Sequence, residues 1–310
     1  MTAELVTASA AGTWQLGGLV INRMGFGSMR LTQDGPAFAA DAAPSDRNRA
    51  IATLRRAVEL GVNHIDTAAF YFSALRSANE LINTALAPYP DDLVIVTKVG
   101  PGRDTWGNWT NAARPDQLRG QVEENLRQLG RDHLDVVNYR RQASVQSISE
   151  HFGALAELRD AGLIRHLGIS GVEPAHLAEA QAIAPVVCVQ NAYSVSDRRP
   201  ESRALLQACG EQGIAFVPFF AIAGTRRHGG TGRDGDPGSA GAAEPRQLSD
   251  IARAHDATVA QIRLAWTLHQ GPHVLAIPGT GNPDHLLENV AAGAIGLSDD
   301  ELASLAEVSR

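Results

Sequence analysis

The chain has 310 residues, of which 44% are hydrophobic and 20% charged, and its formal net charge at neutral pH is −7. This composition is typical of a globular protein with a large core and excludes collagen-like, disordered and disulfide-stapled chains. The sequence has no basic run that could bind a phosphate backbone, no apolar leader and no run of about 18 apolar residues. We therefore expect a cytoplasmic protein with no nucleic-acid or membrane partner.

A β-hairpin is the first predicted element. The segments Trp14 to Leu16 and Leu19 to Ile21 flank Gly17-Gly18, a pair that favours a two-residue hairpin turn.

A repeating unit of helix, glycine and strand follows. Ile51, Leu54 and Val58 have helical spacing, Gly61 can end that helix in the left-handed conformation, and residues 62–66 then form an apolar strand. The same unit recurs three times, at Leu118, Val122, Leu126, Leu129 and Gly130; at Ile148, Phe152, Leu155, Leu158 and Gly162; and at Leu205, Leu206, Cys209 and Gly213. Crossover helices of this kind predict parallel strands.

Eight strands are predicted without an intervening linker. They are Met24 to Ser28, Val62 to Asp66, Leu93 to Lys98, Leu134 to Tyr139, Ile164 to Ile169, Val186 to Gln190, Ile214 to Phe219 and Val274 to Ile277. This pattern favours an α/β fold of the (β/α)₈ barrel type, one domain over residues 1–310, with the hairpin closing its bottom. An open doubly wound sheet is the alternative.

Residues 223–245, after the seventh strand, are rich in Gly, Asp and Pro and cannot bury an apolar face. We expect a long flexible loop on the barrel face where active sites form, either as a lid or as a disordered insertion.

Asp66, Tyr71 and Lys98 are the candidate catalytic residues, because all three fall at or just after the carboxyl ends of strands. A lysine that ends a buried strand needs a counter-charge, which Asp66 can supply. An ammonium group beside a phenol lowers the phenol pKa, so Tyr71 becomes a proton donor. Taken singly, the three residues favour a helix N-cap, a rim aromatic and a solvated strand end, and only their convergence on one barrel face favours catalysis.

Five motifs together resemble the aldo-keto reductases. They are GVNHIDTAAFY (61–71), Lys98, LGISGV (167–172), VQNAYS (189–194) and IPGTGNPDHLLEN (277–289), in order and in register from Trp14 to the C-terminus. The resemblance implies a barrel that binds a nicotinamide dinucleotide, usually NADP(H), without a G-x-G-x-x-G turn, which this sequence also lacks.

The resemblance also assigns roles to residues. It makes Tyr71 the general acid, with Lys98 tuning it and Asp66 orienting Lys98. Ser170 and Gln190 would bind the nicotinamide carboxamide and Phe219 would stack on its ring, although strand-end hydrogen bonding and core packing are alternatives. The remaining cofactor contacts that it implies are Ser28, Met29, Thr280, His285, Glu288 and Asn289.

Arg140 is a departure from the family pattern, which ends this strand in a catalytic histidine. Without gaps, LGRDHLDVVNYR (129–140) brings Arg140 to that position, and one slip in register would bring Arg141 there instead. A guanidinium can polarise a carbonyl or bind an anionic substrate group but cannot shuttle a proton. His64 either compensates for the missing histidine or fills a lower barrel layer.

The cofactor segment also departs from the family. Residues 277–289 contain no Lys or Arg for the 2′-phosphate, although Arg226 or Arg227 in the loop could reach it. We expect NADP(H) as the cofactor, with NAD(H) possible.

Trp106 and Trp109 are candidates to form a hydrophobic wall of the substrate site, or alternatively to pack within a surface loop.

No metal is expected, because the sequence contains no histidine pair, Cys-x-x-Cys motif or carboxylate cluster with the spacing of metal ligands. Cys188 and Cys209 are expected to be reduced core residues.

The sequence therefore predicts an enzyme that reduces a small aldehyde or ketone with a nicotinamide cofactor. It resembles a bacterial branch that includes pyridoxal reductases. The alternative is a cofactor-binding sensor or regulatory barrel with little turnover, in view of the missing histidine.

Overall fold

The centre of the protein is a sheet of seven parallel strands, paired in chain order from β3 to β9. The computed structural model describes residues 5–34, 37–38, 42–104, 106–222 and 245–308. The strands are β3 (Phe26–Gly27), β4 (His64–Asp66), β5 (Val94–Val99), β6 (Leu134–Arg140), β7 (Ile164–Ser170), β8 (Val186–Gln190) and β9 (Ala215–Phe216).

The eighth predicted strand, Val274 to Ile277, is wrong as a regular strand, but this segment closes the sheet. Single parallel bridges join Val274 to Phe216 of β9 and Ala276 to Met24 before β3. Arg23 fixes the segment, because its guanidinium donates to the backbone carbonyls of Val274 and Gly271. The curled sheet is thus an α/β barrel.

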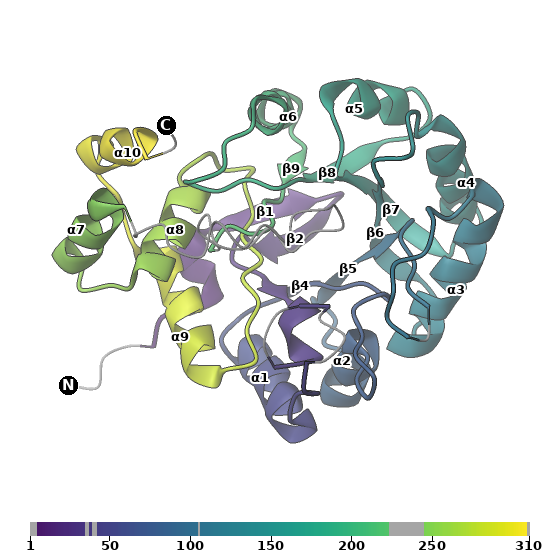
Figure 1. Cartoon of the computed structure of the whole chain (residues 1–310), viewed down its shortest axis with the longest axis horizontal. Coiled ribbons are helices and arrows are strands. Elements are labelled where there is room, and N and C mark those ends of the chain that lie inside the picture. Colours follow the sequence, from purple (N-terminus) through teal and green to yellow (C-terminus); the bar gives the residue numbers. More distant parts are fainter. Residues whose placement is uncertain (1–4, 35–36, 39–41, 105, 223–244, 309–310) are drawn as a thin grey trace.

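Helices cover the outside of the sheet, as Figure 1 shows. The first six are α1 (Arg47–Glu59), α2 (Ala78–Leu86), α3 (Leu118–Leu129), α4 (Ser149–Asp160), α5 (Pro174–Gln181) and α6 (Pro200–Gln212). The C-terminal part adds α7 (Arg246–Ala254), α8 (Val259–Leu268), α9 (Pro283–Ala291) and α10 (Asp299–Ala306). Short 3₁₀ turns are η1 (Ala8–Ala11), η2 (Ser28–Leu31), η3 (Pro115–Gln117) and η5 (Ala292–Ala294).

The predicted helix ends are present. Gly130 and Gly213 end α3 and α6 in the left-handed conformation, which glycine adopts without steric cost. The predicted strand ends lie within three residues of the observed ones, and those of β8 coincide; β3 and β9 are the shortest, because only part of each predicted run pairs with a neighbour.

Period-two alternation determines which side chains enter the barrel. Val94 and Val96 of β5 join an interior cluster with Val136 of β6, whereas Ile95 and Val137 pack into the larger cluster that includes the helices. Lys98 and Arg140 continue the inward-facing series, so the strands deliver both cations to the same end of the barrel.

The N-terminal hairpin consists of β1 (Thr13–Leu16) and β2 (Leu19–Asn22), paired antiparallel across Gly17 and Gly18. Its Leu16 and Ile21 are fully buried in the interior cluster. The predicted loop of residues 223–245 lies outside the described residues, except for Pro245. No helix in the described part of the chain is both long and apolar enough to span a bilayer.

Candidate active site

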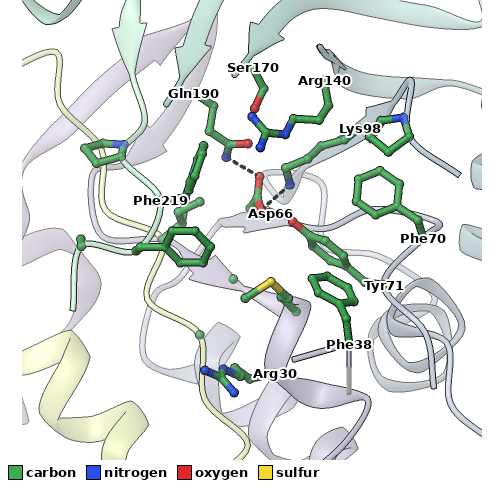
Figure 2. A pocket seen from close by; sticks show the side chains of 18 of the residues that line it. Arg30, Phe38, Asp66, Phe70, Tyr71, Lys98, Arg140, Ser170, Gln190 and Phe219 are labelled. Carbon is green, nitrogen blue, oxygen red and sulfur yellow. Dashed lines mark hydrogen bonds and ion pairs between the residues drawn. The ribbon is translucent and has the colours of Figure 1, made fainter. Parts of the chain in front are cut away.

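A cavity of about 350 Å³ opens at the carboxyl ends of the strands. Figure 2 shows side chains from several strands and loops converging on it. Residues that line it include Gly27, Met29, Arg30, Phe38, Asp66, Phe70, Tyr71, Lys98, Trp109, Arg140, Ser170, Gln190, Phe219 and Gly279.

Asp66, Lys98 and Tyr71 come together in this cavity, and all three are buried. The Nζ atom of Lys98 lies 2.6 Å from Oδ1 of Asp66 and donates a second hydrogen bond to the carbonyl oxygen of Thr67 at 2.9 Å. It also lies 4.9 Å from the ring centroid of Tyr71. The other Asp66 oxygen accepts a hydrogen bond from Gln190 Nε2 at 2.8 Å. The carboxylate therefore has a partner on each oxygen.

The protonation of the pair and of the phenol follows from burial and charge. Burial lowers the pKa of Lys98, but Asp66 and Tyr71 outweigh it, so the net direction is upward and Lys98 stays an ammonium. Burial raises the pKa of Tyr71, and Lys98 only partly offsets this effect. The expected net lowering of the Tyr71 pKa is thus wrong, because desolvation of the phenolate dominates. Tyr71 is fully protonated at neutral pH.

Arg140, rather than Arg141, faces the cavity, which resolves the ambiguity in register. Arg140 ends β6 in register with Ser170 and lies 5.1 Å from the ring centroid of Phe219. Figure 2 shows its guanidinium turned inward. Arg141 instead donates to the carbonyl oxygen of Val145. No carboxylate among the described residues forms an ion pair with Arg140.

An aromatic wall formed by Phe38, Phe70 and Trp109 lies on the Tyr71 side of the cavity. The Trp109 ring centroid is 5.1 Å from that of Phe38 and 5.8 Å from that of Phe70. Trp106, the other predicted wall residue, is 82% exposed and does not line the cavity. Its loop turns about Asp104, whose carboxylate accepts from the backbone N–H of Trp106, so Trp109 alone faces inward.

Two buried polar atoms test whether a nicotinamide group fits this cavity. Ser170 Oγ and Gln190 Oε1 are buried without a hydrogen-bond partner, although both residues line the cavity. A primary amide offers N–H donors to Gln190 and a carbonyl acceptor to Ser170, so the nicotinamide carboxamide fits these two orphaned groups. Phe219 adds a partly exposed aromatic ring beside them.

The other expected cofactor residues lie at varying depths. Met29 lines the cavity, but Ser28 is fully buried and its hydroxyl donates to Thr67 Oγ1 at 2.8 Å, so its side chain faces away from a ligand. Thr280 follows the cavity residue Gly279, and its Oγ1 accepts from the N–H of Asn282. On α9, His285 is exposed, Glu288 is half-buried and Asn289 is buried.

Other residues near the site, among them Arg30, Phe38, Phe70 and Arg103, were not predicted from the sequence. Arg30 lines the cavity, and a Cβ built on Gly281 would lie 3.6 Å from its carbonyl oxygen. Phe38 joins the aromatic wall, and Arg103 packs behind it, 5.1 Å from the Phe38 ring centroid. The sequence offered a signal for Arg30, because it directly follows Ser28 and Met29, which the resemblance assigned to the cofactor.

His64 is buried on the strand that carries Asp66, and burial lowers its pKa to about 4. It is therefore neutral near pH 7. Burial raises the pKa of the Cys188 and Cys209 thiols to about 12, so both are unreactive free thiols. Within the described ranges, no group of three metal-ligating side chains comes together.

The barrel holds a buried lysine–carboxylate pair beside a tyrosine, and two orphaned polar groups that fit a carboxamide. This arrangement is the one expected of a nicotinamide-dependent oxidoreductase. Residues 23–310 match the model of the Aldo/keto reductase family. The chain belongs to this family, and the resemblance drawn from its five motifs is confirmed.

Individual relatives agree with the family match. The chain is 40% identical to a pyridoxine 4-dehydrogenase of Escherichia coli, over 97% of this chain and 99% of that protein. Among solved structures, a thermostable aldo-keto reductase in complex with the inhibitor epalrestat gives a TM-score of 0.77 at 30% identity, covering 96% and 99% of the two chains. An aldo/keto reductase from Klebsiella pneumoniae in complex with NADP and acetate gives 0.72 at 26% identity, covering 94% and 93%.

The protein is therefore an NAD(P)H-dependent enzyme that reduces an aldehyde or ketone to an alcohol. Nothing in these comparisons supports the alternative of a sensor barrel, because the curated relative is itself an oxidoreductase.

Proposed function

We propose that Tyr71 is the general acid of carbonyl reduction, that Lys98 and Asp66 are its electrostatic partners, and that Arg140 binds the substrate. The bound nicotinamide cofactor supplies a hydride to the carbonyl carbon. As the carbonyl oxygen gains charge, the O–H bond of Tyr71 breaks and its proton moves to that oxygen, giving the alcohol. Lys98 stabilises the phenolate left behind. The observation that carries the proposal is the buried Lys98–Asp66 pair beside Tyr71 in the cavity.

The proposed substrate is an aromatic aldehyde with an anionic or acceptor-rich group near the carbonyl. Arg140 is a permanent cation facing the cavity without a carboxylate partner among the described residues, so such a group would neutralise it. The aromatic wall suits a planar ring. The name of the 40% identical relative points in the same direction, and pyridoxal, whose ring hydroxyl adjoins its aldehyde, is the first compound to test.

NADPH is the proposed first cofactor and NADH the second. Ser170, Gln190, Phe219 and Met29 would hold the nicotinamide end. Thr280, His285, Glu288 and Asn289 would follow along the start of α9 toward the adenosine, with Arg30 as the nearby cation on the cavity wall. Binding constants for the two cofactors would decide the preference.

Replacement of Tyr71 by Phe tests the catalytic proposal. We expect Tyr71→Phe to abolish turnover, measured as loss of reduced-cofactor absorbance with pyridoxal, while cofactor binding persists. Tyr193 is a matched control, because it is also buried but stacks on Trp266 outside the cavity. Turnover by Tyr71→Phe at the rate of the Tyr193→Phe control would refute the assignment.

Replacement of Arg140 by Met tests the substrate class. The ratio of kcat/KM for 2-carboxybenzaldehyde to that for benzaldehyde measures the preference for a neighbouring anion. We expect Arg140→Met to reduce this ratio between about tenfold and a hundredfold, the range for a charge-assisted hydrogen bond. The adjacent Arg141→Met variant should leave the ratio unchanged. An equal ratio in wild type and Arg140→Met would contradict the proposed role.

We also propose that the β1–β2 hairpin closes the barrel end opposite the cavity and that residues 1–310 form one domain. The burial of Leu16 and Ile21 among inward-facing barrel residues supports the first statement.

A further inference from the structure

A chain of buried polar side chains runs between the barrel wall and helices α2 and α3, outside the active-site cavity. Ser28 Oγ donates to Thr67 Oγ1 at 2.8 Å, and Thr67 Oγ1 donates to Asn79 Oδ1 at 2.7 Å. Asn79 Nδ2 donates to Asn125 Oδ1 at 2.9 Å, and Thr97 Oγ1 donates to the same oxygen at 2.6 Å. All five side chains are fully buried.

The apolar side chains that pack between the strands and these helices belong to the main hydrophobic cluster. Burying amides and hydroxyls costs free energy unless they are paired, and apolar side chains would fill the same space without that requirement. The network therefore needs an explanation beyond packing.

Two members of the network, Thr67 and Thr97, adjoin residues of the active site. Thr67 follows Asp66 in the chain, and its carbonyl oxygen accepts a hydrogen bond from Lys98 Nζ at 2.9 Å. Thr97 directly precedes Lys98. Asn79 and Asn125 thus hold, from behind the barrel wall, the two chain segments that carry the buried ion pair.

We propose that Asn79 and Asn125 are positioning residues for carbonyl reduction, fixing the Thr67 carbonyl and the Lys98 backbone so that the ammonium group stays directed at Tyr71. This inference rests on the proposed roles of Tyr71 and Lys98. An ammonium has three N–H donors, and Asp66 and Thr67 accept two of them. Their positions therefore set the direction of the third.

The charged groups that face Tyr71 are Lys98 from β5, Asp66 from β4 and Arg140 from β6. Asp66 has hydrogen bonds of its own to Lys98 and Gln190, whereas Thr67 loses its Asn79 partner in such a variant, so we expect the change to fall mainly on the contribution of Lys98. Because Lys98 lowers the pKa of Tyr71, a displaced ammonium lets that pKa rise further.

The test compares Asn79→Leu with Asn83→Leu. Asn83 lies one turn further along α2 and also bridges α2 to α3, by donating to the carbonyl oxygen of Gln128, but it is outside the network. For Asn79→Leu we expect kcat with pyridoxal to fall between about tenfold and a hundredfold, as for a misplaced reacting group, with an unchanged cofactor dissociation constant. The alkaline fall of kcat should move to higher pH. Asn83→Leu should lower the thermal midpoint without either change.

A second pair of variants serves if Asn79→Leu does not fold. Thr67→Val replaces the hydroxyl with a methyl group of similar size, whereas Thr67→Ser retains the hydroxyl. Thr67→Ser should therefore keep kcat within about twofold, while Thr67→Val lowers kcat as Asn79→Leu does. Equal kcat and equal pH profiles in Asn79→Leu and Asn83→Leu, or in the two Thr67 variants, would overturn the inference. Turnover by Tyr71→Phe would instead overturn the proposed function, so the two failures are distinguishable.

Discussion

At the scale of single residues, the position of the Arg140 side chain depends on its neighbour Gly171. Its guanidinium enters the cavity over Phe219 and passes Gly171, which adopts a left-handed φ of 67°. A Cβ at position 171 would collide with Nη1 of Arg140. The glycine is therefore required for two reasons, backbone conformation and the path of the arginine side chain.

Replacement of Gly171 by Ala should displace Arg140 and reduce the preference for anionic aldehydes. Gly162→Ala is the matched control, because Gly162 also has a positive φ, of 82°, but open space where its Cβ would lie. Both variants incur left-handed strain of about 1 kcal/mol in the free energy of unfolding. Only Gly171→Ala should lower the ratio of kcat/KM for 2-carboxybenzaldehyde over benzaldehyde, by roughly tenfold. A similar ratio in both variants would show that Arg140 adjusts without loss.

At the scale of structural elements, Arg103 joins the two loops that form the aromatic side of the cavity. From the loop after β5, Arg103 Nη1 donates to the carbonyl oxygen of Phe72 at 2.6 Å, and its Nε donates to that of Gly107 at 2.9 Å. Its guanidinium carbon lies 4.5 Å from the Phe72 ring centroid and 5.7 Å from that of Trp109. The loop that contains Tyr71 is thereby attached to the loop that contains Trp109.

Replacement of Arg103 by Met should loosen this attachment. We expect kcat/KM for benzaldehyde to fall by between about tenfold and a hundredfold, because both the wall and the backbone beside Tyr71 lose a constraint. Acetaldehyde has no ring to pack against the aromatic wall, so its KM should change less than the KM for benzaldehyde. Arg76→Met is the control, since Arg76 donates to loop carbonyls of Ser45 and Leu75 away from the cavity. Equal KM changes for the two aldehydes would exclude a role in the wall.

The sequence predicted those elements and residues that depend on local periodicity. The helix–glycine–strand units set the parallel order, and alternation along the strands brought Asp66, Lys98 and Arg140 to one end of the barrel. The eighth strand failed because its apolar composition is that of a strand, whereas its neighbours offer it only isolated bridges.

Other features depend on tertiary contacts that no local pattern encodes. Asn79 and Asn125 occupy helical positions that suit a solvent-facing side chain equally well, and only the packing of α2 and α3 on the barrel buries them. The net pKa direction of Tyr71 required the extent of its burial, which the spacing from Asp66 does not give. The choice between Trp106 and Trp109 depended on the turn about Asp104.

At the scale of the whole molecule, the barrel interior combines an apolar lower part with a polar upper part. His64 lies one layer below Asp66 on β4, in register with Val94 of the apolar cluster, is almost fully buried, and its Nδ1 has no hydrogen-bond partner. The interior therefore holds this imidazole in its neutral form, which couples the stability of the fold to pH.

The free energy of unfolding should fall as pH decreases from about 6.5 to about 4, and His64 should account for part of the loss. Burial lowers the folded-state pKa of His64 from 6.5 to about 4. Above pH 6.5 neither state binds the proton; between the two values the unfolded chain binds it and the folded chain does not, so acid favours unfolding. The shift corresponds to about 3 kcal/mol at its limit. Urea unfolding at pH 7.5 and 4.5 measures it, with His64→Gln expected to lose less stability than the exposed His285→Gln control. Equal losses in the two variants would mean that His64 does not carry this linkage.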